Sequence, residues 1–452
     1  MTMSQKLNLT YDHLAAQSAA ASQVDADLYS RYEVKRGLRD INGKGVLAGL
    51  TQIGEVCAHT EAADGTMTGP GNLVYRGIDI NELVNGFLQS GRNGFEETAY
   101  LLLFGRLPDA ATLRAFEAML YANRALPADF VHDSILKLPS RDIMNAMSQS
   151  VLALYTLDDQ AESTDLPNVV RQSLRLIALF PVLAAYSYRA HAYRFSEKSL
   201  ILHAPSPTLS TAANFLRMLR KNQSCTPLEA RLLDLALVLH AEHGGGNNSS
   251  FTTHVVTSSG TDTYAAVTAA LCSLKGPRHG GANIRVAQMF EEIKREVKDW
   301  SNDGQIEDFL DKLVRKEAFD RSGLIYGIGH AVYSVSDPRS LILREQVAAL
   351  AREKELEAEM DLYRRVERLA PEVIGRHRKI YKGVSANVDF YSGLLYRMLN
   401  IPQELFTPIF AIARIVGWSA HRIEELANNG KIIRPAYKSV AERRHYLPLE
   451  QR

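Results

Sequence analysis

Cysteine is scarce in this chain. Only three occur among the 452 residues, at positions 57, 225 and 272, too few and too scattered for a disulfide scaffold or a zinc knuckle. Such a composition suits a reducing cytosol. An excess of charge of either sign is also lacking, since 52 lysines and arginines stand against 51 aspartates and glutamates. This balance argues against a nucleic-acid or membrane-surface role that depends on net charge, and leaves local basic sites for a small anion open.

Signals for targeting or membrane insertion are lacking as well. The first 27 residues contain no apolar stretch long enough for a signal peptide and carry three aspartates, which a mitochondrial transit peptide avoids. Apolar stretches such as 173–188 are interrupted, there by Arg175 and Pro181, and fall short of a membrane span. We therefore expect a cytoplasmic protein with neither a membrane nor a nucleic acid as partner.

Strand signals are few. Only 45–54 and 73–75 have the pattern of short strands, and the chain has no strand–helix alternation, no Gly-x-Gly-x-x-Gly and no phosphate-loop motif. Helical periodicity dominates instead. The predicted helices are 96–103 (ended by Gly105), 231–243, 263–274, one that begins near Ala282, 340–370 and 404–428. The expected fold class is all-α (mainly helical) with a short N-terminal β feature, and the length favours two lobes over one.

Four glycine-rich motifs in the C-terminal half carry histidine or a carboxylate. They are His240-Ala-Glu-His243-Gly-Gly-Gly-Asn247, Lys275-Gly-Pro-Arg-His279-Gly-Gly-Ala-Asn283, Gly327-Ile-Gly-His330-Ala-Val-Tyr333 and Asn387-Val-Asp389-Phe-Tyr-Ser-Gly393. Glycine lets a ligand approach the backbone closely, and histidine titrates nearest to neutral pH. Together these motifs indicate acid–base chemistry on a small substrate.

Each of these residues also has an ordinary structural interpretation. His279 precedes a helix, whose N-terminus disfavours the imidazolium, so a neutral hydrogen-bond donor is expected; a surface histidine in a turn is the alternative. Asp389 has apolar neighbours that raise the pKa of a carboxyl group, which suits a base. Arg339 offers a planar fork for a carboxylate. Taken alone, Asp389 and Arg339 are more often cap or salt-bridge residues, and His240 is a candidate core histidine.

A metal site is a further alternative. His240, His243 and His254 lie close in sequence, and a metalloenzyme that uses them would bind a stoichiometric metal ion. The spacing His-x-x-His without cysteine or a His-Glu-x-x-His motif is weak evidence for zinc. We therefore predict no metal.

The order and spacing of the motifs resemble those of the citrate synthases, including the 2-methylcitrate synthases. The resemblance runs from about Val34 to Tyr437. Further motifs that support it are Tyr75-Arg-Gly-Ile, Phe95-Glu-Glu-Thr-Ala-Tyr-Leu-Leu-Leu-Phe-Gly and Ile433-Arg-Pro435. The resemblance implies an acyltransferase that condenses acetyl-CoA with oxaloacetate and water to give citrate and CoA. Asp389 would take the methyl proton, His279 would hydrogen-bond the thioester oxygen, and His330 would polarise the ketone of oxaloacetate.

The same resemblance implies the binding residues. Oxaloacetate would be bound by His243, Asn247, Arg339, Phe410 and Arg414, and by Arg434 reaching over from the partner subunit of a homodimer. CoA would be bound by Leu324, Ile325, Gly327 and Lys382. Acetyl-CoA is then a co-substrate, and no cofactor is permanently bound.

The resemblance also implies a domain organisation. Residues 1–33 would form an N-terminal arm, 34–283 with 394–452 a large domain, and 284–393 a smaller inserted domain that closes over the cleft about Gly280-Gly281 and Gly393. Arg278 departs from the family pattern, in which leucine usually precedes the catalytic histidine. The choice between acetyl-CoA and propionyl-CoA therefore stays open, and a 2-methylcitrate synthase is the first alternative. A non-catalytic CoA-binding or regulatory homologue is the alternative from another class.

Overall fold

The computed structural model describes residues 10–40, 45–58, 69–330, 332–333, 335–378 and 383–451. The chain divides into two compact units, one made of residues 1–49 and 434–452 and the other of residues 50–433. The predicted division of the helical body into 34–283 with 394–452 and 284–393 is not tested by this partition and stays a prediction. Lys382 lies outside the described residues.

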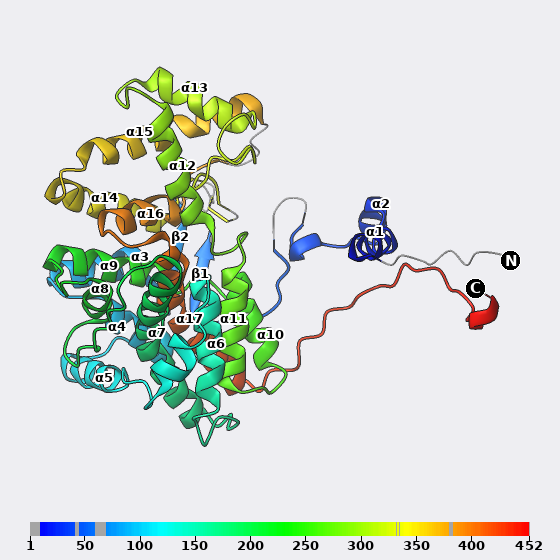
Figure 1. Cartoon of the computed structure of the whole chain (residues 1–452), viewed down its shortest axis with the longest axis horizontal. Coiled ribbons are helices and arrows are strands. Elements are labelled where there is room, and N and C mark those ends of the chain that lie inside the picture. Colours follow the sequence, from blue (N-terminus) through cyan, green and yellow to red (C-terminus); the bar gives the residue numbers. More distant parts are fainter. Residues whose placement is uncertain are drawn as a thin grey trace. The chain divides into compact units, whose positions relative to one another are not determined.

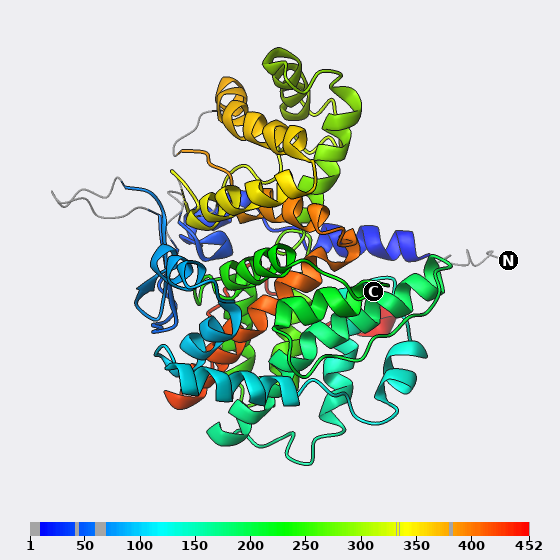
Figure 2. The same ribbon diagram turned by 90° about the vertical axis from the view of Figure 1, so that its left-hand side faces the viewer.

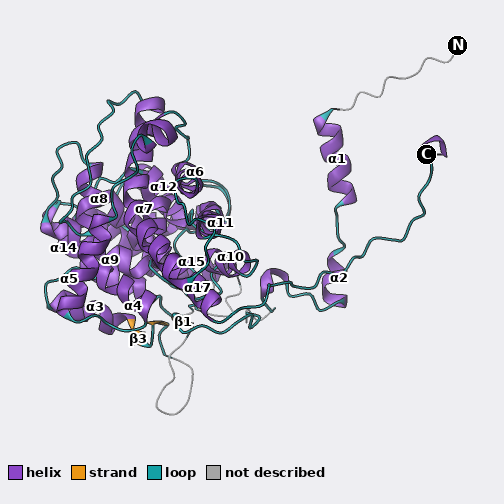
Figure 3. Ribbon diagram, turned by 90° about the horizontal axis from the view of Figure 1, so that it is seen from below, coloured by secondary structure: helices purple, strands orange, loops and turns teal. Residues whose placement is uncertain are grey.

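The unit of residues 50–433 is mainly helical, which confirms the predicted fold class (Figures 1 and 3). Its first helices are α3 (Ile80–Gln89), α4 (Phe95–Phe104), α5 (Ala110–Ala122), α6 (Ile143–Tyr155), α7 (Leu166–Phe195), α8 (Thr211–Leu219), α9 (Pro227–His240), α10 (Asn248–Thr257) and α11 (Thr263–Lys275). They are followed by α12 (Ala282–Glu296), α13 (Asp303–Val314), α14 (Pro338–Glu353), α15 (Glu357–His377), α16 (Val388–Met398) and α17 (Phe406–Ala427). Short helical turns are η2 (Val131–Leu136) and η3 (Gln403–Leu405).

Most predicted helices are present, with shifted ends. Gly105 ends α4 in the left-handed region at φ 79°, and α12 begins at Ala282 as expected. The stretch predicted to be helical over 340–370 contains two helices, α14 and α15, and α15 continues through Pro371. The helix predicted over 231–243 ends at His240, so that His243 lies beyond it in a loop.

A small antiparallel sheet precedes the helices. Its strands are β1 (Gly54–Cys57), β2 (Asn72–Tyr75) and β3 (Ile78–Asp79), in the order β1-β2-β3, with Gly54 opposite Tyr75. The prediction of a strand over 45–54 was wrong in its bounds, because 46–53 is irregular. Leu47 and Leu50 are 84% and 89% exposed there, so the apolar residues of this stretch do not form a buried strand face.

The core is organised around α7, a helix of 30 residues that continues through Pro181. It packs against α17, α6 and α8, and most of its side chains are buried. By length and composition α7 is apolar enough to cross a membrane, but 83% of its most apolar stretch is buried within the protein. It is therefore a core helix. A cytoplasmic location stays a prediction.

Helices α12 to α16 lie together. α13 packs on α15 and α12, α14 packs on α15 and α16, and α12 packs on α16. In Figure 1 α12, α13 and α15 form the upper part of this unit, and Figure 2 shows the yellow α14 above the green α9, against which it packs. α9 also packs against α16.

The other unit consists of the two chain ends. It contains α1 (Tyr11–Ala21), α2 (Ala26–Arg31) and the short turns η1 (Arg36–Leu38) and η4 (Leu449–Gln451). No residue of α1 or α2 is buried. Arg434 begins the C-terminal part of this unit and is exposed.

Candidate active site

Two predicted site histidines meet. The rings of His243 and His330 are 5.3 Å apart between centroids and nearly perpendicular, and Tyr333 lies 4.5 Å from His330 and 5.6 Å from His243. The segment that carries His243 is fixed by Tyr75, whose hydroxyl lies 3.0 Å from the Glu242 carbonyl oxygen and accepts from the Glu242 N–H at 3.3 Å. Burial lowers the pKa of His243 well below its usual value, so this ring is neutral.

His330 is oriented by its own loop. Its Nδ1 accepts from the backbone N–H groups of Val332 and Tyr333, both at 3.0 Å. An accepting Nδ1 leaves the proton of the neutral ring on Nε2. His330 therefore presents an Nε2–H donor.

Backbone hydrogen bonds join this loop to the start of α16. The Asn387 N–H donates to the Gly327 carbonyl oxygen at 2.9 Å, and the Asn387 Nδ2 donates to that of Gly329 at 2.8 Å. Gly327 has φ 82°, and a Cβ there would lie 2.8 Å from Phe390 and from Val286, so a side chain does not fit. The loop of His330 and the helix of Asp389 are thus held together.

His279 is the other histidine with a fixed ring. It lies in the turn before α12, and its Nε2 accepts from the Ser249 N–H at 3.3 Å and lies 3.0 Å from Ser249 Oγ. Ser249 is in the first turn of α10, where backbone N–H groups have no partner within the helix. Ser249 Oγ in turn accepts from Trp418 Nε1 at 3.0 Å. The neutral His279 ring therefore carries its proton on Nδ1.

The pKa of His279 is lowered to about 4. Burial is the main cause and the positive charge of Arg414 the second. The His279 ring is thus neutral, as expected, but the cause is burial and the charge of Arg414 and not the helix N-terminus. Arg278, its neighbour, is exposed.

Asp389 is the carboxylate of the set. It lies in the first turn of α16, whose N-cap Asn387 accepts from the Asp389 N–H at 3.0 Å. Burial raises the pKa of Asp389 to about 6, although the charges of Arg339 and Arg414 act in the opposite direction. The Asp389 carboxylate forms no hydrogen bond with any described residue, so it is available to a substrate.

Arg339 is bound by Asp337. Its Nε donates to Oδ1 at 3.0 Å and one terminal nitrogen donates to Oδ2 at 2.8 Å, and both side chains are buried. Asp337 Oδ2 also accepts from the Val388 N–H at 3.1 Å, at the start of α16. Asp337 therefore fixes Arg339 and the helix of Asp389 at the same time.

Arg414 is a buried cation whose charge acts on His243, His279 and Asp389. It is fully buried, its Nε donates to the His240 carbonyl oxygen at 2.7 Å, and both terminal nitrogens lack a hydrogen-bond partner among the described residues. Its guanidinium lies 4.7 Å from the Phe410 ring. Burial lowers the pKa of Arg414 to about 10, so the group stays charged at neutral pH. Two buried unpaired nitrogens fit a bound carboxylate.

His240 is a core residue in this arrangement. It is buried, its Nδ1 lies 2.9 Å from the Ala236 carbonyl oxygen, and its ring packs edge-on against Phe410 at 4.8 Å. Burial lowers its pKa to about 3. His240, His243 and His254 do not form a common metal-binding group within the described part of the chain.

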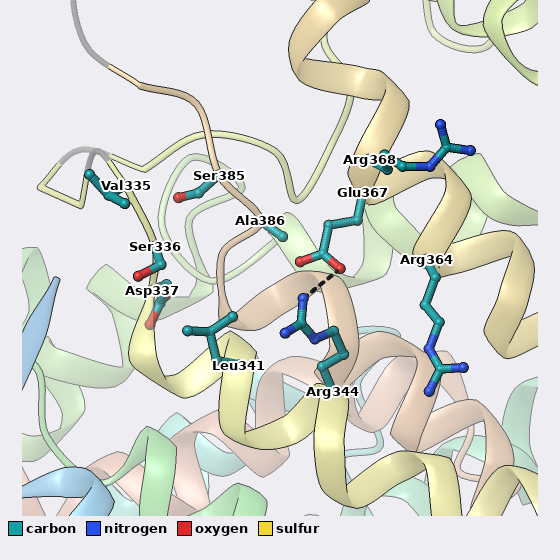
Figure 4. A pocket seen from close by; sticks show the side chains of 10 residues that line it. All are labelled: Val335, Ser336, Asp337, Leu341, Arg344, Arg364, Glu367, Arg368, Ser385 and Ala386. Atoms are coloured by element: carbon teal, nitrogen blue, oxygen red, sulfur yellow. Dashed lines mark hydrogen bonds and ion pairs between the residues drawn. The ribbon is translucent and has the colours of Figure 1, made fainter. Parts of the chain in front are cut away.

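A cavity of about 490 Å³ is lined in part by Asp337 (Figure 4). Its wall on α15 includes Glu367, which accepts from Tyr391 Oη at 2.6 Å and from Arg344 at 3.4 Å. The cavity is also lined by Val335, Ser336, Leu341, Arg364, Arg368, Ser385 and Ala386. None of the predicted catalytic residues lines it.

For the remaining predicted residues the structure gives the local position and the exposure. Asn247 is the N-cap of α10, and its Oδ1 accepts from Ser249 Oγ at 3.0 Å. Leu324 is 46% exposed, whereas Ile325 is buried. Arg434 lies in the unit of the chain ends.

Sequence reasoning missed several residues that position the site. Ser249, Trp418, Tyr333 and Asp337 hold or stack on the predicted side chains. Asp337 could have been found, since Asp-Pro at a helix start is a common N-cap signal and α14 begins at Pro338. Trp418 carries no comparable signal, because it lies 169 residues from Ser249 in the chain.

The chain is similar to proteins of one known family. Residues 40–436 match the family described as "Citrate synthase, C-terminal domain". A citrate synthase of Synechocystis sp. is 35% identical over 413 residues, which are 90% of this chain and 93% of the relative. A 2-methylcitrate synthase of Shewanella oneidensis is 32% identical over 415 residues, 90% and 98% of the two chains. The solved ternary complex of carboxymethyl coenzyme A and oxaloacetate with citrate synthase from Thermoplasma acidophilum superposes with a TM-score of 0.75 at 25% identity, over 93% of this chain and 99% of that one.

Proposed function

The chain belongs to the citrate synthase family, and from this premise we propose that it condenses acetyl-CoA with oxaloacetate and water to give citrate and CoA. The observation that carries the proposal is the set of protonation states. Two neutral histidines have their N–H positions fixed by backbone amides, and a partly buried carboxylate has a raised pKa. Weakly acidic C–H bonds need such a combination of base and pre-placed donors.

Asp389 is proposed to start the reaction. Its carboxylate takes a proton from the methyl group of acetyl-CoA while His279 Nδ1–H donates to the thioester oxygen, which becomes an enol or enolate. A base with a pKa of about 6 is deprotonated at neutral pH and more basic than an ordinary aspartate. His279 is neutral there and does not compete as a base.

His330 is proposed to complete the carbon–carbon bond. The nucleophilic carbon attacks the ketone of oxaloacetate, and His330 Nε2–H donates to the developing alkoxide. Water then hydrolyses the thioester and releases CoA. His243, edge-on to His330, is proposed to bind oxaloacetate with Asn247 and Phe410.

The carboxylates of oxaloacetate are proposed to bind to Arg414 and Arg339. Arg414 offers two buried nitrogens without a partner. Arg339 already has a bidentate partner in Asp337, so it would bind the substrate through its remaining N–H groups. Arg434 of a partner subunit is proposed as a third cation, which requires a homodimer.

CoA binding is proposed for Leu324, Ile325 and Gly327, and for Lys382. The first three belong to the segment that is hydrogen-bonded to Asn387 beside Asp389.

Movement of 284–393 about Gly280-Gly281 and Gly393 is proposed to close the site and exclude water. Equal interlobe angles in structures with and without oxaloacetate would contradict it.

A 2-methylcitrate synthase is the second candidate. The observation in its favour is the 32% identity with the Shewanella oneidensis 2-methylcitrate synthase over 90% of this chain. The two activities are separated by the ratio of kcat/KM for propionyl-CoA and acetyl-CoA. A ratio above one assigns the second activity.

Thiol release from acetyl-CoA in the presence of oxaloacetate tests the proposal. Wild type is expected to release CoA, and Asp389→Asn is expected to lose about 10²–10⁴-fold in kcat, the usual contribution of a general base. Asp133→Asn, which removes an exposed carboxylate paired with Lys137 and leaves Asp389 unchanged, is the control. Full activity of Asp389→Asn would show that another group is the base.

A further inference from the structure

We propose that His254, His421 and Glu424 form a structural site for a divalent transition-metal ion of the zinc type. The three side chains come from α10 and α17 and lie outside the proposed catalytic set. The spacing in the sequence groups His254 with His240 and His243. The structure places His254 with other partners instead.

The separations of the ligand atoms fit one small ion. His254 Nε2 lies 3.1 Å from His421 Nδ1, His421 Nδ1 lies 3.9 Å from Glu424 Oε2, and all three atoms are within 4.8 Å of one another. Two nitrogens bound to one tetrahedral zinc ion are about 3.3 Å apart, since each bond is about 2.0–2.1 Å long. Movements of a fraction of an ångström at each histidine would therefore give the coordination distances.

A carboxylate holds the outer nitrogen of each ring. Glu425 Oε2 lies 2.7 Å from His254 Nδ1, and Glu242 Oε1 lies 3.1 Å from His421 Nε2. Metal-binding histidines usually donate their second N–H to a carboxylate in this way, which fixes the tautomer. Both rings of the pair thus have the outer partner typical of a metal ligand.

These two tautomers create a conflict that a cation removes. If Nδ1 of His254 and Nε2 of His421 carry the protons, the two inner nitrogens have only lone pairs, and they face each other at 3.1 Å. A metal ion between the nitrogens would turn this repulsion into coordination. A single extra proton shared by the pair is the competing arrangement, and the experiment below separates the two.

Glu424 supplies an independent observation. Its Oε1 accepts from the Gln52 N–H at 2.8 Å, which fixes the carboxylate. Its Oε2 is buried and has no hydrogen-bond partner among the described residues. A buried carboxylate oxygen without a donor is costly, and coordination to a cation satisfies it.

The site lies against the loop that follows His243. A Cβ added to Gly245 would be 3.5 Å from His254 Nε2 and 3.4 Å from His421 Cε1, so this backbone passes directly over the pair. Glu242, which holds His421, is the residue before His243. A bound metal would therefore fix the segment from Glu242 to Asn247, and its role would be structural.

Metal binding to the full-length wild-type chain tests the proposal. Chelator-treated protein is loaded with Zn²⁺, dialysed and analysed for metal, and titrated in parallel with Co²⁺, whose visible absorption reports tetrahedral nitrogen and oxygen ligands. One metal ion per chain is expected, with a rise in Tm. His254→Gln and Glu424→Gln should lose the ion, and His132→Gln, an exposed histidine paired with Asp133, should retain it.

Glu425, which holds the outer nitrogen of His254, should affect the Zn²⁺ affinity less than a ligand does. Glu425→Gln should weaken Zn²⁺ binding about 10–100-fold without abolishing it. Substoichiometric zinc in the wild type, or no visible Co²⁺ band, would overturn the proposal without relying on a variant that must fold. A Tm that depends on pH but not on metal would also overturn it in favour of the shared proton. Thiol release, assayed separately, reports on the catalytic proposal alone.

Discussion

Asp337 accepts two hydrogen bonds from the Arg339 guanidinium and another from the first N–H of α16. One buried carboxylate thus fixes a proposed substrate ligand and the helix that carries the proposed base. Removing it should leave the Arg339 guanidinium buried without its counter-ion. We expect Asp337→Ala to lower the free energy of unfolding by about 3–5 kcal/mol, as is typical for one broken buried pair, and to raise KM for oxaloacetate.

Urea unfolding of Asp337→Ala and of Asp303→Ala checks this prediction. Asp303 pairs with Arg365 and Arg368 but its side chain is 42% exposed, so its loss should cost much less than the loss of Asp337. An equal decrease in the free energy of unfolding of the two variants would show that the buried Asp337–Arg339 pair stabilises the fold no more than an exposed pair does.

The pH dependence of catalysis should report Asp389. Because the base must be deprotonated and its pKa is raised to about 6, kcat/KM should be half-maximal near pH 6 and fall about tenfold per pH unit below it. His279, with a pKa of about 4, should not contribute above pH 5 or so. Steady-state rates of thiol release between pH 5 and 8 measure the profile. A kcat/KM that stays nearly constant from pH 8 down to pH 5 would contradict the raised pKa.

Stability should fall on acidification partly because of His279. Its pKa is lowered from 6.5 to about 4 in the folded protein, so the unfolded chain binds more protons between these values. Stability from this group is therefore complete above pH 6.5 and declines as the pH falls towards 4. Asp389 acts in the opposite sense between its ordinary pKa of 3.8 and about 6. The decrease in Tm between pH 7 and pH 5 should be smaller in His279→Gln than in the wild type. An equal decrease in the two proteins would show that other groups cause the acid destabilisation.

Ser249→Ala tests how the His279 ring is oriented. The variant removes the hydroxyl between His279 and Trp418 but keeps the backbone N–H that donates to Nε2. We expect kcat to fall roughly 5–10-fold, the equivalent of about 1 kcal/mol for one hydrogen bond, and KM for oxaloacetate to rise as well, because the same hydroxyl donates to Oδ1 of Asn247. Ser250→Ala is the matched control, since the neighbouring buried hydroxyl has no partner among the described residues. A similar fall in both variants would point to packing of α10 instead.

The sequence was most informative where one residue type determines the local structure. Gly105 ended α4, and the apolar spacing after His279 correctly placed the start of α12 at Ala282. The bounds of the strand expected over 45–54 were wrong, because apolar residues of this stretch such as Leu47 and Leu50 are exposed. Local pattern alone does not reveal what the rest of the chain covers.

In the candidate site, too, some features could be predicted from the sequence and others could not. Its glycine-rich motifs could be recognised, and the structure shows that His243 and His330 meet. The groups that set their tautomers could not be predicted, because those partners are backbone amides and side chains distant in sequence, such as Trp418 for Ser249. The pairing of His254 with His421, 167 residues apart, was likewise inaccessible from spacing.

The burial of α7 has a consequence for hydrogen exchange. Its amides lie in a helix that neighbouring helices cover on most sides, so a local opening large enough to admit water must displace much of the core. Amides around Ala184 should therefore exchange only through global unfolding and be the slowest in the molecule. Their exchange rates would give the global free energy of unfolding under native conditions, free of denaturant extrapolation.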